Sequence, residues 1–288
     1  MGAVIRPRDE GDFNLAFLFP GEVAEMRART GLVILPLAPI EWHGPHLAMG
    51  CDGLLAHAFA RRLAVELESP YFPPLFAGTE RERKPEVLRS IGFTGQEYIE
   101  GMDFPANAVK SAYLKEEVFS LTVRGTLEAL FQRMEYRAVV IVNGHGADNQ
   151  RATLDRLCAE YNAAGPARLM WVYPGFPRSL IAGSIGHAAA EETSMLSATW
   201  PHCVDLSRLP PVGALKNTEH AVVDGDTFDG APTPDFTVRA AQDPRLHADP
   251  AIGARFVEEA VRETVADIRE KLLSLTTGEF GPMIDSTT

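Results

Sequence analysis

Three side chains that commonly bind metal ions stand close together early in the chain. Glu41 and His43 follow an apolar run, and Asp52 opens the next helix-like pattern. Glu41 and His43 are two residues apart, so on an extended segment their side chains point to the same side. Two carboxylates and an imidazole that converge there suit Zn²⁺, Mn²⁺ or Fe²⁺. This spacing predicts metal-dependent chemistry at the connection between a strand and a helix.

Two later clusters contain residues of the same kind. His145 lies in Asn-Gly-His-Gly, directly after the most strand-like run of the chain. Ligands of open α/β sheets bind beyond the carboxyl ends of the strands, which favours a functional His145. A phosphate-binding turn is the rival interpretation, but G-x-G-x-x-G and a Walker lysine are both absent. His187 and Glu192 lie before or within the first turn of a predicted helix, where the helix dipole alone also explains a carboxylate.

The elements that must position these residues alternate between strand and helix. We predict strands at 32–36, 71–76, 138–143 and 168–173, and helices at about 52–68, 116–134, 149–163, 191–199 and 250–273. This alternation predicts an α/β fold, a three-layer sandwich with a mostly parallel central sheet. We expect one domain over 1–288, with an irregular excursion at about 209–249 that is rich in Pro, Gly and Asp. The charged stretch at 78–112 also breaks the alternation.

The composition indicates in which compartment the protein is expected and which classes of partner it is not expected to bind. The 288 residues are 45% hydrophobic and carry a net charge of −12. The sequence shows no basic stripe, which argues against nucleic acid and anionic membrane surfaces, and no run could span a bilayer. Three cysteines without a C-x-x-C pair predict reduced thiols and a cytoplasmic protein. Cys51, beside Asp52, is interpreted as a small buried residue, with a ligand or nucleophile role as the alternative.

Taken in order, the three clusters resemble the motifs of the creatininase superfamily. The matching residues are Glu41-Trp42-His43-Gly44-Pro45-His46 with Asp52, Asn143-Gly144-His145-Gly146, and His187 with Glu192-Thr193-Ser194. The resemblance implies a creatininase-like fold and two divalent metal ions per chain, Zn²⁺ and/or Mn²⁺, with Fe²⁺ also possible. It places one ion on Glu41, Asp52 and His145, and the other on His43, Asp52 and Glu192.

One departure from the family pattern concerns the ligands. Creatinine-hydrolysing members place a Glu two residues after the second-motif histidine, where this chain has Ala147. Glu192 is therefore the predicted last ligand. Asp148 remains the reserve candidate, or a partner that orients a ligand.

The resemblance also implies a metal-dependent hydrolase with a small-molecule substrate. Hydroxide held by the metal pair would attack a carbonyl of a cyclic or amide substrate. His187, with an ordinary pKa of about 6.5, would act as general acid and base. The stretch before His187 lacks the tryptophans that close over creatinine, so we expect another substrate, with C–N cleavage preferred over C–C cleavage. The family commonly forms hexamers, which implies a homo-oligomer.

Several alternatives stay open. One is a hydrolase that opens the ring of a cyclic polyol ketone, and another is a non-catalytic α/β protein that binds a metal or metabolite. The insert at 78–115 is either a solvated surface segment or the wall of a pocket for a polar or anionic substrate. The residues that favour such a pocket are Arg81, Arg83, Lys84, Lys110, Tyr113 and Lys115.

Overall fold

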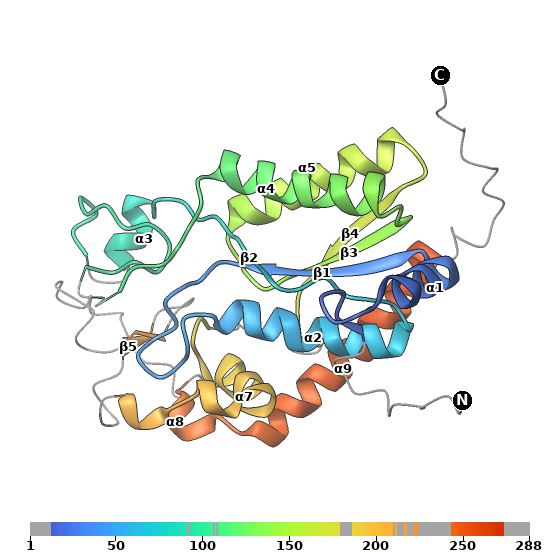
Figure 1. Cartoon of the computed structure of the whole chain (residues 1–288). Helices are drawn as coiled ribbons and strands as arrows, with labels where there is room; N and C mark the ends of the chain where they lie inside the picture. Colours follow the sequence, from blue (N-terminus) through green and yellow to red (C-terminus); the bar gives the residue numbers. More distant parts are fainter. Residues whose placement is uncertain are drawn as a thin grey trace.

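A four-stranded parallel sheet with the order β2-β1-β3-β4 forms the middle layer of the molecule (Figure 1). The computed structural model describes residues 13–90, 93–105, 107, 109–178, 186–209, 211, 216–217, 222–223 and 243–273. The strands are β1 (Leu32–Ala38), β2 (Leu75–Phe76), β3 (Ala138–Asn143) and β4 (Arg168–Val172). A separate antiparallel pair joins β5 (Lys216–Asn217) to β6 (Val222–Val223).

Helices cover both faces of the sheet. One face packs against α2 (Cys51–Leu67), α7 (Ala190–Thr199) and α9 (Pro250–Ile268), and the other against α4 (Glu116–Glu128) and α5 (Asp148–Ala164) (Figure 1). β1 and β3 are therefore buried along their whole length, as expected for a covered parallel sheet. The predicted three-layer α/β sandwich is confirmed.

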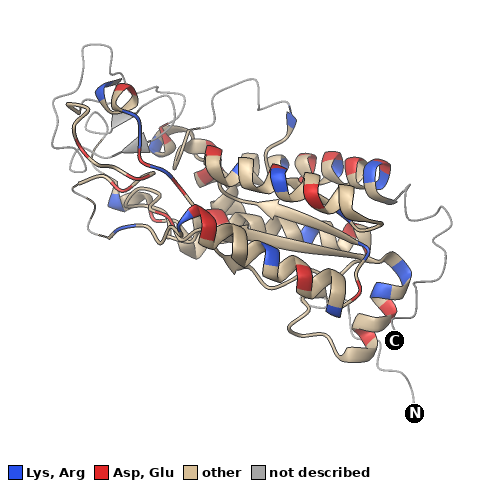
Figure 2. Cartoon of the chain, turned by 90° about the horizontal axis from the view of Figure 1, so that it is seen from above, with Lys and Arg blue, Asp and Glu red and all other residues tan. Residues whose placement is uncertain are grey.

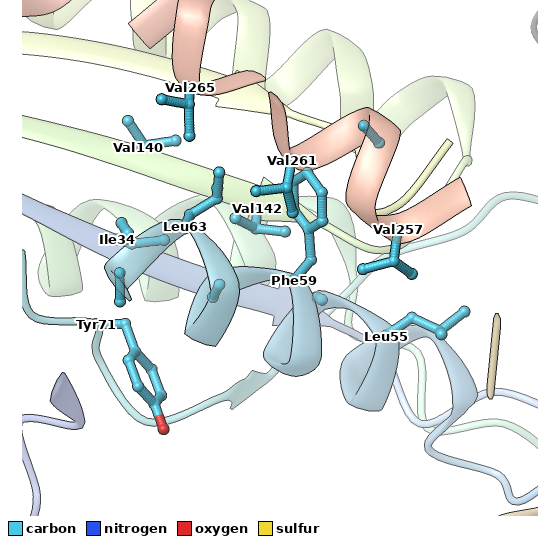
Figure 3. Packing of buried hydrophobic residues seen from close by; sticks show 14 of the residues in the cluster. Ile34, Leu55, Phe59, Leu63, Tyr71, Val140, Val142, Val257, Val261 and Val265 are labelled. Atoms are coloured by element: carbon cyan, nitrogen blue, oxygen red, sulfur yellow. The ribbon is translucent and has the colours of Figure 1, made fainter. Parts of the chain in front are cut away.

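Alternate residues of the central strands supply two separate cores. Ile34 and Val140 belong to the core on the α2 side, whereas Val33 and Val139 belong to the core on the α4 side. Figure 3 shows the first core, in which apolar side chains of α2 meet those of α9 over the strands; the labelled residues of these two helices are Leu55, Phe59, Leu63, Val257, Val261 and Val265. This packing holds α2, which carries Asp52, firmly against the sheet.

Several elements are shorter or additional relative to the prediction. β2 spans Leu75–Phe76 rather than 71–76, because Pro73 and Pro74 have no N–H to donate to a neighbouring strand. Tyr71 instead forms isolated bridges with Asn14 and Ile34. The helices α1 (Pro20–Thr30), α3 (Pro85–Ser90) and α8 (Pro244–His247) were not predicted. Short 3₁₀ turns cover Pro201–Cys203 and Leu206–Arg208, and π-helical turns at Ala129–Arg133 and Arg269–Leu273 extend α4 and α9.

Most of the expected excursion at 209–249 lies outside the described residues, and the single domain over 1–288 stays a prediction. Figure 2 shows both signs of charge interspersed on the helices that cover the sheet, while the strands between them are uncharged along most of their length. Among the described helices, none combines the length and apolarity needed to cross a membrane.

Candidate metal centre

The candidate site lies at the carboxyl ends of β1 and β3. These strands run parallel and end level, since Leu37 is paired with Asn143. Glu41 and His43 follow β1, and His145 follows β3, so the topology delivers all three side chains to one edge of the sheet. The sequence placed His145 at this edge for the same reason.

A close approach between two backbones completes this arrangement. A Cβ at position 144 would lie 2.8 Å from the carbonyl carbon of Asp52, so only glycine fits between β3 and the start of α2. Asp52 itself occupies the first turn of α2, as predicted. The glycine thus lets His145 and Asp52 meet, although they are 93 residues apart in sequence.

Asn143 holds the loop that carries His145. Its side-chain amide donates to the carbonyl of His145 at 2.8 Å, and its Oδ1 accepts from Nε2 of Gln150 at 2.6 Å. Oε1 of Gln150 in turn accepts from the backbone N–H of Thr79 at 2.9 Å. All four residues are buried, so this network fixes the loop without help from solvent.

Asp52 is the centre of the cluster. Its Oδ1 lies 2.8 Å from Nε2 of His43, and its Oδ2 lies 3.2 Å from Nδ1 of His145. The same nitrogen of His145 is 3.2 Å from Oε2 of Glu41. One carboxylate therefore faces two histidines through its two oxygens, and Glu41 joins it at the second histidine.

Glu192 reaches the cluster from another element, the first turn of α7. Its Oε2 lies 4.0 Å from Nε2 of His43 and accepts a hydrogen bond of 2.6 Å from the backbone N–H of Ala188. The five residues predicted as ligands are thus brought together. Asp52 contacts both histidines, but Nε2 of His43 lies 3.8 Å from Oε2 of Glu41 as well as 4.0 Å from Oε2 of Glu192, so the division of the five residues between two ions stays a prediction.

Burial makes the charges of this cluster interdependent. Burial alone lowers the pKa of His43, but the charge of Asp52, its hydrogen bond and the charges of Glu41 and Glu192 raise that pKa to about 10. Burial also raises the pKa of Glu192, to about 7. For Asp52, burial is outweighed by His43 and His145, which keep its pKa below the usual range.

The donor set fits a pair of divalent cations. The buried carboxylates of Glu41 and Asp52 and the half-buried carboxylate of Glu192 crowd together, and a buried charge is stable only when it is paired or bound to a metal. Every predicted donor is oxygen or imidazole nitrogen, which suits Zn²⁺, Mn²⁺ and Fe²⁺. Ligating atoms of Glu41, Glu80 and His145 lie within 4.8 Å of one another, as do those of Glu41, His43 and His187.

His187 lies beside this cluster. Its ring centroid is 4.0 Å from that of His43, and its Nε2 is 2.7 Å from the carbonyl oxygen of Trp42. The prediction that His187 keeps an ordinary pKa is wrong, because burial and the charge of His43 lower the pKa to about 3. The unprotonated imidazole is therefore the stable form in this arrangement.

Two reserve candidates are placed differently. The carboxylate of Asp148 is 89% exposed and pairs with Arg151, because it points outward from the first turn of α5, away from the cluster. Cys51 is buried, with its sulfur within 4.8 Å of ligating atoms of His43 and Asp52. Burial, together with the nearby carboxylates, raises the pKa of the Cys51 thiol well above its usual value, which disfavours a thiolate ligand.

Both alternatives for the segment at 78–115 find support in its residues. Arg81 pairs with Glu116 at the surface, whereas Arg83 bonds to the carbonyl of Gly101 and its charge acts on His187 and Glu80. Tyr113 does reach the site, and its hydroxyl donates to Oε1 of Glu41 at 2.5 Å.

Sequence reasoning missed Glu80 in the same segment. Its Oε2 lies 3.8 Å from Nε2 of His145. The alternating charges around Glu80 are typical of a solvated surface, and no sequence signal distinguished it from its neighbours.

Comparison with known proteins gives three findings. The family profile described as "Creatininase: Creatinine amidohydrolase" matches residues 20–268. A creatinine amidohydrolase of Pseudomonas putida is 25% identical over 220 residues, which cover 67% of this chain and 75% of the relative. Two solved structures share the fold with a TM-score of 0.60: a manganese creatininase at 21% identity and a mutant creatininase of the Zn–Zn type at 22%. Each alignment covers 90% of this chain and 98% of the other.

Proposed function

The chain belongs to the creatininase family, and from this premise we propose that it is a metal-dependent hydrolase of a small amide or cyclic amide. The observation that carries the proposal is the position of Asp52, whose two carboxylate oxygens lie 2.8 and 3.2 Å from the nitrogens of two different histidines. A carboxylate placed in this way between two histidines is suited to be shared by two metal ions.

The proposed ligands are the five residues of the cluster around Asp52, divided as the family resemblance implies. Glu41 and His145 would hold one ion with Asp52, and His43 and Glu192 would hold the other. When bound, such a pair of ions activates water at neutral pH and polarises a carbonyl oxygen. Zn²⁺ and Mn²⁺ are the proposed ions, since both occur in similar solved creatininases.

His187 would carry the proton. A backbone carbonyl can only accept a hydrogen bond, so the contact with Trp42 places the hydrogen of the neutral imidazole on Nε2. This leaves the lone pair on Nδ1, which lies 3.9 Å from Oε2 of Glu41 and faces the site. Nδ1 of His187 would therefore take a proton from the attacking water and return it to the leaving nitrogen.

The substrate class rests on the family and on this proton carrier. An amide nitrogen must be protonated as it leaves, and His187 would supply at Nδ1 the proton that it had first taken from the attacking water. The substrate itself is proposed only as a small amide, lactam or formamide other than creatinine. The stretch at 183–185, on which the expectation against creatinine depends, lies outside the described residues.

A two-stage experiment tests the proposal. The protein is freed of metal with a chelator, reloaded with Zn²⁺ or Mn²⁺, and its metal content is measured by mass spectrometry. The loaded protein is then screened for hydrolysis of lactams, formamides, small peptides and cyclic polyol ketones. We expect about two ions per chain and hydrolysis of an amide that is lost with the metal.

The outcomes separate the alternatives. Two bound ions without hydrolysis of any substrate class would favour the non-catalytic metal-binding protein. Cleavage of a polyol ketone with no amide cleavage would favour C–C hydrolysis. A chain that binds no metal would contradict the proposed function altogether.

A further inference from the structure

The segment between β2 and α4 runs along the end of the sheet and reaches the candidate metal centre. Ala112 forms an antiparallel bridge with Ile40, in which the N–H of Ala112 donates to the carbonyl of Ile40 at 2.7 Å. This bridge places Tyr113 beside Glu41, although they are 72 residues apart in sequence. The position of Tyr113 is thus fixed by the backbone and does not depend on its side chain alone.

The hydroxyl of Tyr113 accepts one hydrogen bond and donates another. It accepts a hydrogen bond of 3.2 Å from the N–H of Met102, and a backbone N–H can only donate. Its own hydrogen is therefore available to Oε1 of Glu41, at 2.5 Å. The other oxygen of Glu41, Oε2, faces Nδ1 of His145 at 3.2 Å. Tyr113 thus occupies one oxygen of Glu41 and leaves the second to the cluster.

On the premise of the proposed metal-dependent function, we infer that Tyr113 is a positioning residue that holds the carboxylate of Glu41 in the orientation needed to bind a divalent ion. Ligating carboxylates depend on hydrogen bonds from a surrounding layer of residues, and the loss of such a partner typically weakens metal binding by about 10- to 100-fold. The donor is well suited to this task, because a tyrosine hydroxyl keeps its hydrogen at neutral pH and can donate it.

The surroundings of Tyr113 favour this role over simple packing. Gly101 has a left-handed φ of +53°, and a Cβ there would lie 2.5 Å from the hydroxyl oxygen of Tyr113. The backbone thus approaches the hydroxyl more closely than any residue with a side chain would allow. The rings of Tyr113 and His145 lie 6.0 Å apart, so the tyrosine also borders the second ligand of the same group.

The test compares Tyr113→Phe with Tyr98→Phe. Tyr98 lies in the same segment but is 72% exposed. The control therefore removes an equivalent hydroxyl from a position in contact with solvent. Binding of Mn²⁺ to each chelator-treated protein is measured by isothermal titration calorimetry, and the unfolding temperature without metal is measured in parallel. We expect Tyr113→Phe to raise the Mn²⁺ dissociation constant of one site by about 10- to 100-fold. Tyr98→Phe should match the wild type.

An activity lost at limiting Mn²⁺ but restored at saturating Mn²⁺ would further support positioning. If the wild type binds Mn²⁺ and Tyr113→Phe binds it equally well, the role of Tyr113 is refuted while the proposed function stands. If the wild type binds neither Mn²⁺ nor Zn²⁺, the proposed function fails, and this assignment fails with it.

Discussion

Replacement of Asp52 by asparagine would remove the one carboxylate that faces both histidines of the cluster. The side-chain amide of the variant would keep one oxygen, but an NH₂ group would replace the other, at a position 2.8 to 3.2 Å from an imidazole nitrogen. The shared ligand of both proposed ions is then lost. Asp52→Asn should therefore abolish the stabilisation that metal binding gives to the folded chain.

The magnitude follows from linkage between binding and folding. At a free Mn²⁺ concentration 100 times the dissociation constant, one bound ion stabilises the fold by about 2.7 kcal/mol. The wild type should gain at least this much, whereas Asp52→Asn should gain less than about 1 kcal/mol. The variant also loses half of a buried charge pair, which lowers its stability without metal by a few kcal/mol. The comparison must therefore use the gain on adding Mn²⁺.

The assay is urea unfolding with Mn²⁺ and with a chelator, followed by circular dichroism. Asp148→Asn is the matched control, because this carboxylate neighbours the His145 loop in sequence but is 89% exposed and paired with Arg151. The control should show the full wild-type gain. A gain in Asp52→Asn equal to that of the wild type would refute the reasoning, and a loss confined to Asp148→Asn would restore that residue as the ligand.

Three further predictions concern other parts of the structure. His187→Gln should abolish hydrolysis but still bind two ions, with exposed His202→Gln as the control; full turnover in His187→Gln would contradict the proton-carrier role. Gly144→Ala should lower the free energy of unfolding by about 1 to 3 kcal/mol, because its Cβ would collide with the backbone of Asp52; an unchanged urea midpoint would count against this. Burial and the charge of Arg61 lower the pKa of His57 to about 4, so the unfolded chain takes up a proton below pH 6.5 while the folded chain does not. Stability should fall between pH 6.5 and pH 4 by about 1 to 2 kcal/mol after allowance for solvent screening, and His57→Gln should flatten this part of the profile.

The sequence predicted best where periodicity and buried runs decide the structure. β3 spans Ala138–Asn143, as predicted, because a strand covered on both faces is apolar along nearly its whole length; only its last residue, Asn143, is polar. The helix α1 was missed, since none of its residues is buried and its pattern carries no apolar face. Gly31, which follows the last residue of α1, adopts the left-handed conformation with which helices commonly end.

The residues of the candidate site differ in the same way, since those that follow buried strands were predicted best. Glu41, His43 and His145 stand directly after buried strands, so topology alone predicts that they meet. Glu80 and Tyr113 come from an irregular segment whose course depends on tertiary contacts such as the bridge between Ile40 and Ala112. No local pattern encodes such a course. The lowered pKa of His187 likewise arises from residues distant in sequence, and so could not be read from its neighbours.

A single tripeptide, Glu41-Trp42-His43, links the two proposed halves of the chemistry. The side chains of its outer residues face His145 and Asp52, while its middle carbonyl anchors the ring of His187. Any shift of this short stretch would therefore move two of the proposed ligands and the proton carrier together, and the alignment among these three residues would survive. Substitutions elsewhere around the site could then change which substrate fits, while these three residues keep their arrangement.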